Sequence, residues 1–175
     1  MREPFQLARE LLTTIPGIST NVANVITAET DVDMDVFDTA GPLASWAGVC
    51  PGQNESAGRV ESTRTRPGNS YLKAALGTAA MSMSRSKTIY LAVKYRRIQS
   101  HARAMHAVVA LEHTLLVIVW NMLKQGVAYE ELGIDHYDRT NPERARQRLL
   151  RQMKSLGFEP HPHTTFRSLR SPLFP

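Results

Sequence analysis

The sequence predicts a mainly α-helical protein with a basic second half. Three observations support this fold class. Apolar residues recur with helical spacing, residues suited to helix caps precede several of these stretches, and little of the chain alternates as a β-strand does. We expect one domain over residues 1–157, followed by a flexible tail at 158–175 that is rich in proline and lacks periodicity.

The first expected feature is a pair of short helices over residues 7–30. LARELLTTI has an amphipathic pattern, Pro-Gly ends it, and Ser19 or Thr20 caps the next helix. Free backbone N–H groups of Gly17, Ser19 and Thr20 at this helix start favour a bound phosphate. The pattern resembles the helix-hairpin-helix motif of DNA-binding proteins, although any helical hairpin can use a Pro-Gly turn.

Two short segments follow this hairpin. The aspartates of DVDMDVFD do not fit a calcium loop, because Val36 stands at its glycine position and Pro42 at the position of its bidentate glutamate. We therefore expect a solvated linker. The apolar LASWAGVC at 43–50 fits a buried helical turn and a buried strand equally well.

Residues 51–70 are expected to form an irregular loop, because glycine and proline interrupt them repeatedly. Ser56 lies in this loop, and the basic residues that follow it are Arg59, Arg64, Arg66 and Lys73. The arginine guanidinium matches phosphate bidentately, so a hydroxyl near several arginines suits attack on a phosphodiester. The same residues suit a passive phosphate grip, since a serine hydroxyl is a weak nucleophile without an activating group.

The region from 70 to 126 is expected to be helical. Asn69 or Ser70 caps a helix whose apolar face comprises Leu72, Ala75, Leu76, Ala79 and Met83. An amphipathic helix with a basic side follows at 90–99, and the apolar stretch 102–125 predicts the central helix, closed by Gly126. Polar residues interrupt that stretch, so we expect a buried helix and no membrane anchor. A basic helix is expected at 141–156, with Asn141 as its cap and Pro142 at its first position.

Charge and composition restrict the partners. Residues 1–56 hold two basic and eight acidic side chains, a net charge of −6, whereas the remainder holds 19 basic and eight acidic ones, a net charge of +11. This asymmetry favours a nucleic-acid partner, with a solvated basic surface as the alternative. The single cysteine, Cys50, excludes an internal disulfide and is typical of an intracellular chain. The histidine spacings predict no metal site.

Several of these stretches, taken in order, carry a family resemblance. IPGIS, FDTAGPLASWAGVCPGQNESAG, TRPGNSYLKAAL and AVVALEHTLLVIVWNMLKQGVAYEELGIDHY resemble the C-terminal domain of DEDD-type, bridge-RNA-guided insertion-sequence transposases, the insertion sequence 110/116/902 family. The resemblance covers about residues 10–157. It implies a cytoplasmic, nucleoid-associated bacterial protein that acts in DNA transposition, with DNA, a guide RNA and further copies of itself as partners.

The resemblance also implies a site. Family members read Ser-Ser-Gly-Gly after Pro-x-Gln, where this chain has Glu55-Ser56-Ala57-Gly58, so Ser56 takes the position of the second serine and Glu55 and Ala57 depart from the pattern. The serine of the family attacks DNA and forms a phosphoserine, and a RuvC-like domain supplies carboxylates for Mg²⁺. This sequence has no room for that domain, so we expect an N-terminally truncated transposase without a cofactor of its own. The alternative is a non-catalytic helix-hairpin-helix module that binds DNA or RNA.

Overall fold

The computed structural model describes residues 4–50, 54–56, 59–62, 65 and 67–158. These residues belong to two compact units, the first ending at Ile134 and the second beginning at Asp135. The domain expected over residues 1–157 spans both units. The expected tail at 158–175 lies outside the described residues, apart from Phe158.

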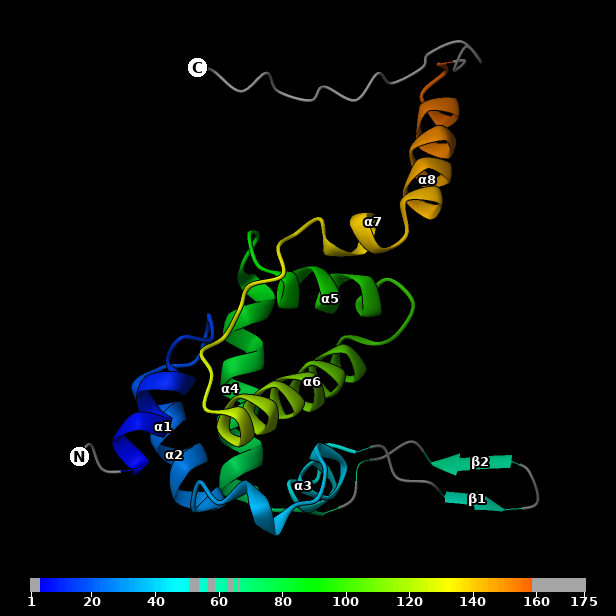
Figure 1. Ribbon diagram of the computed structural model, residues 1–175. Coiled ribbons are helices and arrows are strands. Elements are labelled where there is room, and N and C mark those ends of the chain that lie inside the picture. The colour runs from blue at the N-terminus through cyan, green and yellow to red at the C-terminus, as the bar shows by residue number, and fades with distance from the viewer. Residues whose placement is uncertain (1–3, 51–53, 57–58, 63–64, 66, 159–175) are drawn as a thin grey trace, which may run out of the picture. The chain divides into compact units, whose positions relative to one another are not determined.

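Most of the first unit is helical, as predicted (Figure 1). Its elements are α1 (Pro4–Leu12), α2 (Thr20–Thr30), the 3₁₀ helix η1 (Met34–Val36), α3 (Ala40–Trp46), β1 (Asn54–Ser56), β2 (Arg59–Ser62), α4 (Ser70–Arg85), α5 (Tyr90–Gln99) and α6 (Ala104–Gln125). The second unit contains α7 (His136–Thr140) and α8 (Pro142–Ser155).

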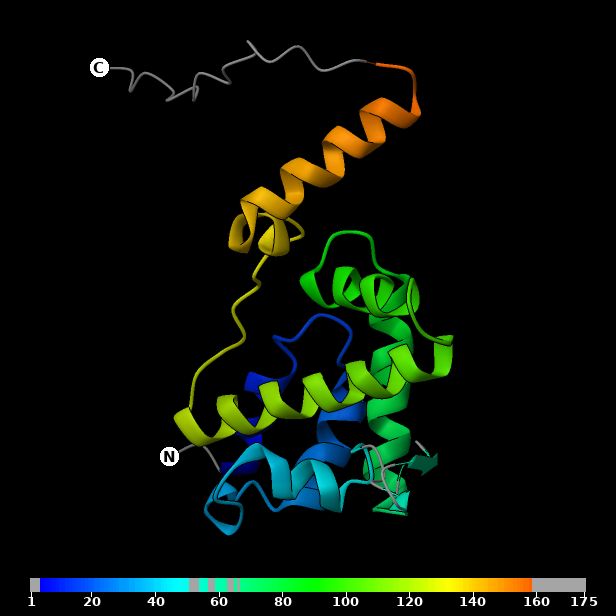
Figure 2. The same cartoon turned by 90° about the vertical axis from the view of Figure 1, so that its right-hand side faces the viewer.

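The core of the first unit is built around α4 and α6. All five residues of the apolar face expected on α4 are buried. Helix α6 crosses α4 and contacts α3 on one side and α5 on the other (Figure 2). By length and composition α6 could cross a membrane, but its buried side chains pack in this core, which accounts for their apolar character.

Side chains fix the start of three helices. The Val22 N–H donates to Ser19 Oγ at 3.3 Å, the Leu72 N–H to Asn69 Oδ1 at 2.9 Å, and the Arg144 N–H to Asn141 Oδ1 at 3.2 Å. Ser19 and Asn69 are therefore the caps, not Thr20 or Ser70. Such caps satisfy backbone N–H groups that a helix start otherwise leaves unpaired.

Helix α1 begins and ends earlier than the expected range 7–15. It runs from Pro4 to Leu12, and turns follow it. The Thr13 hydroxyl donates to the Glu10 carbonyl at 2.9 Å and the Thr14 hydroxyl to the Leu11 carbonyl at 2.6 Å. Threonine hydroxyls compete in this way for backbone carbonyls at the end of a helix.

Strands β1 and β2 form an antiparallel pair where an irregular loop was expected. The facing residues are Asn54 and Ser62, Glu55 and Val60, and Ser56 and Arg59, with a shift of register between Asn54 and Glu55. Each strand is at most four residues long and largely polar. Such strands lack the alternating pattern from which a strand is predicted.

The two segments after the hairpin are ordered. The aspartates of the expected linker are exposed, but Met34 between them is buried, Asp33 caps η1, and Asp35 pairs with Lys124 of α6. The stretch 43–50 lies partly in α3, so its helical interpretation is correct.

A glycine contact holds the start of α4 against the end of α3. A Cβ on Gly68 would lie 2.3 Å from the Gly48 nitrogen and 2.5 Å from the Ala47 carbonyl carbon. We therefore expect Gly68→Ala to lower the free energy of unfolding by roughly 1–3 kcal/mol, measured by urea denaturation. The control is Gly41→Ala, where the nearest atom is at 3.6 Å. Equal stability of the two variants would contradict this packing.

Candidate nucleic-acid interface

The turn between α1 and α2 exposes the residues expected to bind phosphate. Gly17, Ser19 and Thr20 are all exposed. In the described part of the chain, the backbone N–H groups of these three residues have no hydrogen-bond acceptor. An anion at the start of α2 can therefore receive hydrogen bonds from them and interact favourably with the helix dipole.

Gly17 also allows this turn to pack closely on α4. It has a φ of 96°, which is left-handed backbone, and a Cβ there would lie 2.6 Å from Met83 Cγ. The residues expected to pack the two helices together are all buried: Ile15, Ile18, Val22 and Ile26. The position of the turn is thus fixed by the core beneath it.

Ser56 is the last described residue of β1, and its partner across the strand pair is Arg59, the first residue of β2. The pairing brings the backbone of the expected nucleophile next to that of one expected arginine. Arg64 and Arg66 lie outside the described residues. The strand pair follows α3 directly in the chain (Figure 1).

Lys73 and the cap of α4 lie where the chain returns from this strand pair. The Lys73 ammonium donates to Thr65 Oγ1 at 2.9 Å. The Asn69 side-chain amide donates to Glu29 Oε2 of α2 at 2.6 Å, and the Asn69 backbone N–H donates to the Trp46 carbonyl at 3.1 Å. The two bonds of Asn69 tie the start of α4, the helix that carries Lys73, to α2 and α3.

Two aromatic residues near this junction were not predicted as functional. Tyr71, in the first turn of α4, is 71% exposed, and Trp46, at the end of α3, is 41% exposed. Exposed aromatic rings next to cations can stack with unpaired nucleobases. For Tyr71, its place two residues before Lys73 was the signal that could have identified it, whereas Trp46 has no basic residue near it in the sequence.

Glu112 is a third residue that the sequence did not mark as functional. It interrupts the apolar stretch 102–125 of the sequence, yet its side chain is buried in α6. Burial raises the pKa of the Glu112 carboxyl above its usual value, and the positive charge of Lys73 partly opposes that rise. The pattern of α6 alone does not show which residue of another helix lies near Glu112.

Further cations surround the helical core of the first unit. The guanidinium of Arg96 in α5 donates to the carbonyl of Ser86, the residue that caps the end of α4, at 2.8 Å. This hydrogen bond links α5 to the end of α4. The exposed cations of this region are Arg85, Lys87, Arg96, Arg97 and Arg103. They make the surface after α4 predominantly positive.

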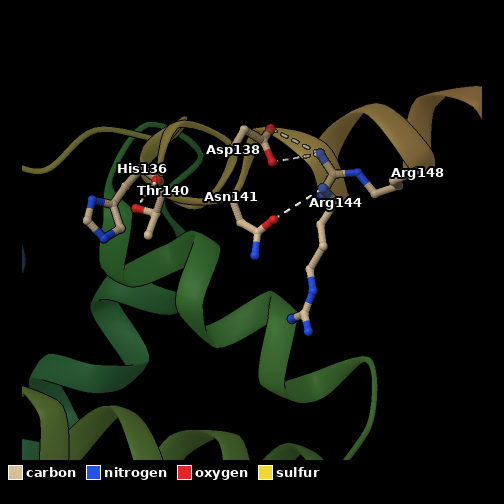
Figure 3. Close-up of polar contacts among 6 residues, drawn as sticks. All are labelled: His136, Asp138, Thr140, Asn141, Arg144 and Arg148. Atoms are coloured by element: carbon tan, nitrogen blue, oxygen red, sulfur yellow. Dashed lines mark hydrogen bonds and ion pairs between the residues drawn. The ribbon is translucent and has the colours of Figure 1, made fainter.

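The second unit carries the basic helix α8. Arg148 donates to both oxygens of Asp138 at 3.0 Å, and the Arg144 side chain extends away from this pair (Figure 3). Arg146 lies 3.9 Å from Glu143. The remaining cations, Arg144, Arg151 and Lys154, have no acidic partner in the part of the chain described. Three charges on α8 are therefore available to a polyanion.

Among the described residues, no three histidine, cysteine, aspartate or glutamate side chains come together as they would around a metal ion. The carboxylates of the aspartate-rich segment are occupied in part by other contacts, since Asp33 accepts from the Asp35 N–H and Asp35 pairs with Lys124. The described residues therefore do not fit the Mg²⁺ that the family resemblance implies.

Comparison with protein families connects this arrangement to a class of protein. A family model for transposases matches residues 9–96, which is 88 of the 175 residues and includes Gly17, Ser56 and Lys73. The chain is thus a transposase-type protein. It belongs to the Transposase IS116/IS110/IS902 family, as the sequence resemblance suggested, and this membership implies interaction with DNA and a role in transposition. No curated protein matches the chain.

The fit of the α1–α2 turn to α4 can be tested with two glycines. Gly17 and Gly126 both have positive φ, but a Cβ on Gly126 would meet nothing within 4 Å. We expect Gly126→Ala to cost about 1–2 kcal/mol from backbone strain alone. Gly17→Ala should cost more because of its overlap with Met83, as measured by urea denaturation. The additional cost of Gly17→Ala over Gly126→Ala should be smaller when Gly17→Ala is made in a Met83→Ala background. If that additional cost is unchanged, the overlap with Met83 is not its cause.

Proposed function

We propose that this chain is the DNA-binding and serine-nucleophile part of an insertion-sequence transposase. The observation that carries the proposal is the family match across the segment that holds Ser56, together with the pairing of the Ser56 and Arg59 backbones. The resemblance assigns the serine of this segment to DNA strand cleavage and rejoining. Cytoplasmic location, a guide RNA and self-association follow from the same resemblance and belong to the same proposal.

The proposed DNA contacts come from both ends of α4. The N–H groups of Gly17, Ser19 and Thr20 bind one phosphate near its C-terminal end, where Met83 underlies the turn. Lys73 in its second turn, with Arg59, Arg64 and Arg66, binds phosphates near Ser56. Phosphate contacts of this kind position a protein on DNA without reading its sequence.

In the proposed reaction the Ser56 hydroxyl attacks a DNA phosphodiester. A bond forms between the serine oxygen and phosphorus, and the bond between phosphorus and one sugar oxygen breaks. The serine proton leaves and the departing sugar oxygen takes up a proton, so the exchange is balanced. The arginines stabilise the negative charge that grows on the phosphate oxygens. Reversal by another DNA end rejoins the strand.

In this proposal, a separate domain supplies the metal chemistry of the family. The carboxylates that hold Mg²⁺ would come from a RuvC-like domain, since the described residues of this chain do not gather such a set. No step above depends on the metal. Without that domain the chain binds DNA and does not recombine it.

A second candidate is a helix-hairpin-helix module that binds DNA or RNA without chemistry. Two departures from the family pattern favour it. Glu55 adds a negative charge next to Ser56 in the sequence, which disfavours a phosphate, and Ala57 replaces a glycine that would let the substrate approach closely. Both candidates predict binding, and they differ in whether Ser56 becomes covalently attached.

Binding itself can be tested by its salt dependence. We expect the chain to bind a DNA duplex or a structured RNA in a gel-shift assay, with affinity that falls steeply from low to moderate salt because bound phosphates release counterions. Lys73→Met should lower the slope of log affinity against log salt by about 1. An affinity independent of salt would contradict the electrostatic basis of the proposal.

The chemistry can be tested by trapping the adduct. When the RuvC-like domain, Mg²⁺ and a guide RNA are supplied in trans, we expect a DNA adduct resistant to denaturation that is lost in Ser56→Ala. Mass spectrometry of the adduct identifies the attached serine. An adduct that persists in Ser56→Ala would place the nucleophile elsewhere, and Ser62→Ala tests Ser62 as the alternative nucleophile. Binding without any adduct would favour the non-catalytic module.

A further inference from the structure

Glu112 is the one charged side chain that is buried among the described residues. It is 6% exposed, and its Oε2 atom has no hydrogen-bond partner in the described part of the protein. A carboxylate removed from water without full hydrogen bonding costs free energy. Its presence inside the helical core therefore calls for a reason other than packing.

The surroundings of Glu112 point to α4. A Cβ on Gly77 would lie 3.2 Å from Glu112 Oε1, so the carboxyl group lies against α4 at Gly77. Lys73 precedes Gly77 by four residues, which places it one helical turn away on the same face. The charge of Lys73 acts on Glu112, and the Lys73 ammonium also donates to Thr65 Oγ1 at 2.9 Å. Lys73 is thus linked to two features: its charge acts on the Glu112 carboxyl of α6, and its ammonium group bonds to Thr65 near the end of the serine segment.

We propose that Glu112 is a positioning residue for Lys73. Its buried carboxylate attracts the ammonium group to the face of α4 that carries Gly77 and so keeps Lys73 beside Thr65. The use of that ammonium against a DNA phosphate rests on the proposed function. The coupling of Glu112 to Lys73 is a property of the free protein and does not rest on it.

A purely structural role would not require a carboxyl group. Glutamine has nearly the same shape and carries no charge to desolvate. Burial raises the pKa of the Glu112 carboxyl, so the folded state holds its proton more tightly than the unfolded state does. The stability from this group is present at low pH and is lost as the pH rises through the folded-state pKa. Glu112→Gln should accordingly be at least as stable as the parent protein at neutral pH.

Binding to DNA tests the positioning role. The probe is a short fluorescein-labelled DNA duplex of mixed sequence, and the readout is anisotropy as a function of salt. We expect Glu112→Gln to bind more weakly than the parent and to lose about 1 from the salt slope, as Lys73→Met does. The variant that combines Glu112→Gln with Lys73→Met should bind no more weakly than Lys73→Met alone, because the two residues act together.

The matched control is Glu143→Gln, which removes the same charge from the exposed first turn of α8. Removal of a negative charge should leave binding to DNA unchanged or strengthen it. The proposal is overturned if Glu112→Gln binds as tightly as Glu143→Gln. Urea denaturation of each variant shows whether a change in binding reflects unfolding.

A second measurement needs no DNA. The carboxyl carbon of Glu112 is titrated by nuclear magnetic resonance in the parent and in Lys73→Met. We expect the midpoint to rise in the variant, because the charge that lowers the pKa of Glu112 is gone. An unchanged midpoint overturns the proposal. If no variant binds DNA, the proposed function fails, and this titration alone decides whether Glu112 and Lys73 are coupled.

Discussion

The packing of α6 across α4 is the contact on which the rest of the first unit depends. Helix α4 contributes small buried side chains at Ala75, Ala79 and Ala80, whereas α6 contributes larger ones such as Leu111 and Leu115. Small residues on one helix let the other approach closely, so the pair forms a dense centre. The α1–α2 hairpin, α3 and α5 then attach to one or other of these two helices.

This arrangement makes α4 the common support of the candidate site. Near its start, Asn69 and Lys73 hold the segment that returns from the strand pair. Near its end, Met83 lies beneath the turn at Gly17. Lys73 and Met83 are ten residues apart, which corresponds to roughly 15 Å along the helix axis. The two proposed phosphate-binding groups, at that separation, can engage one duplex only if α4 stays straight and its ends stay anchored.

Much of the helical framework could be predicted from the sequence, because its signals are local. The spacing of apolar residues predicted the buried face of α4. Short polar side chains predicted a cap at Ser19 or Thr20 and another at Asn69 or Ser70, and the structure has Ser19 and Asn69. The strand pair could not be predicted, because its strands are short and largely polar and so lack the alternating apolar pattern. Glu112 could not be predicted as a site residue, because its proposed positioning role depends on Gly77 and Lys73, which lie on another helix. Long-range contacts of this kind leave no periodic trace in the sequence.

The contact between Gly68 and Gly48 brings together the two ends of the segment that carries Ser56. Its anchor points touch through backbone atoms, with a further hydrogen bond from Asn69 to Trp46. The helical framework thus holds the two ends of this segment together at its base, and lengthening a closed segment adds little entropy cost. The length and composition of the serine-bearing segment can therefore change while the helices that hold its two ends remain the same.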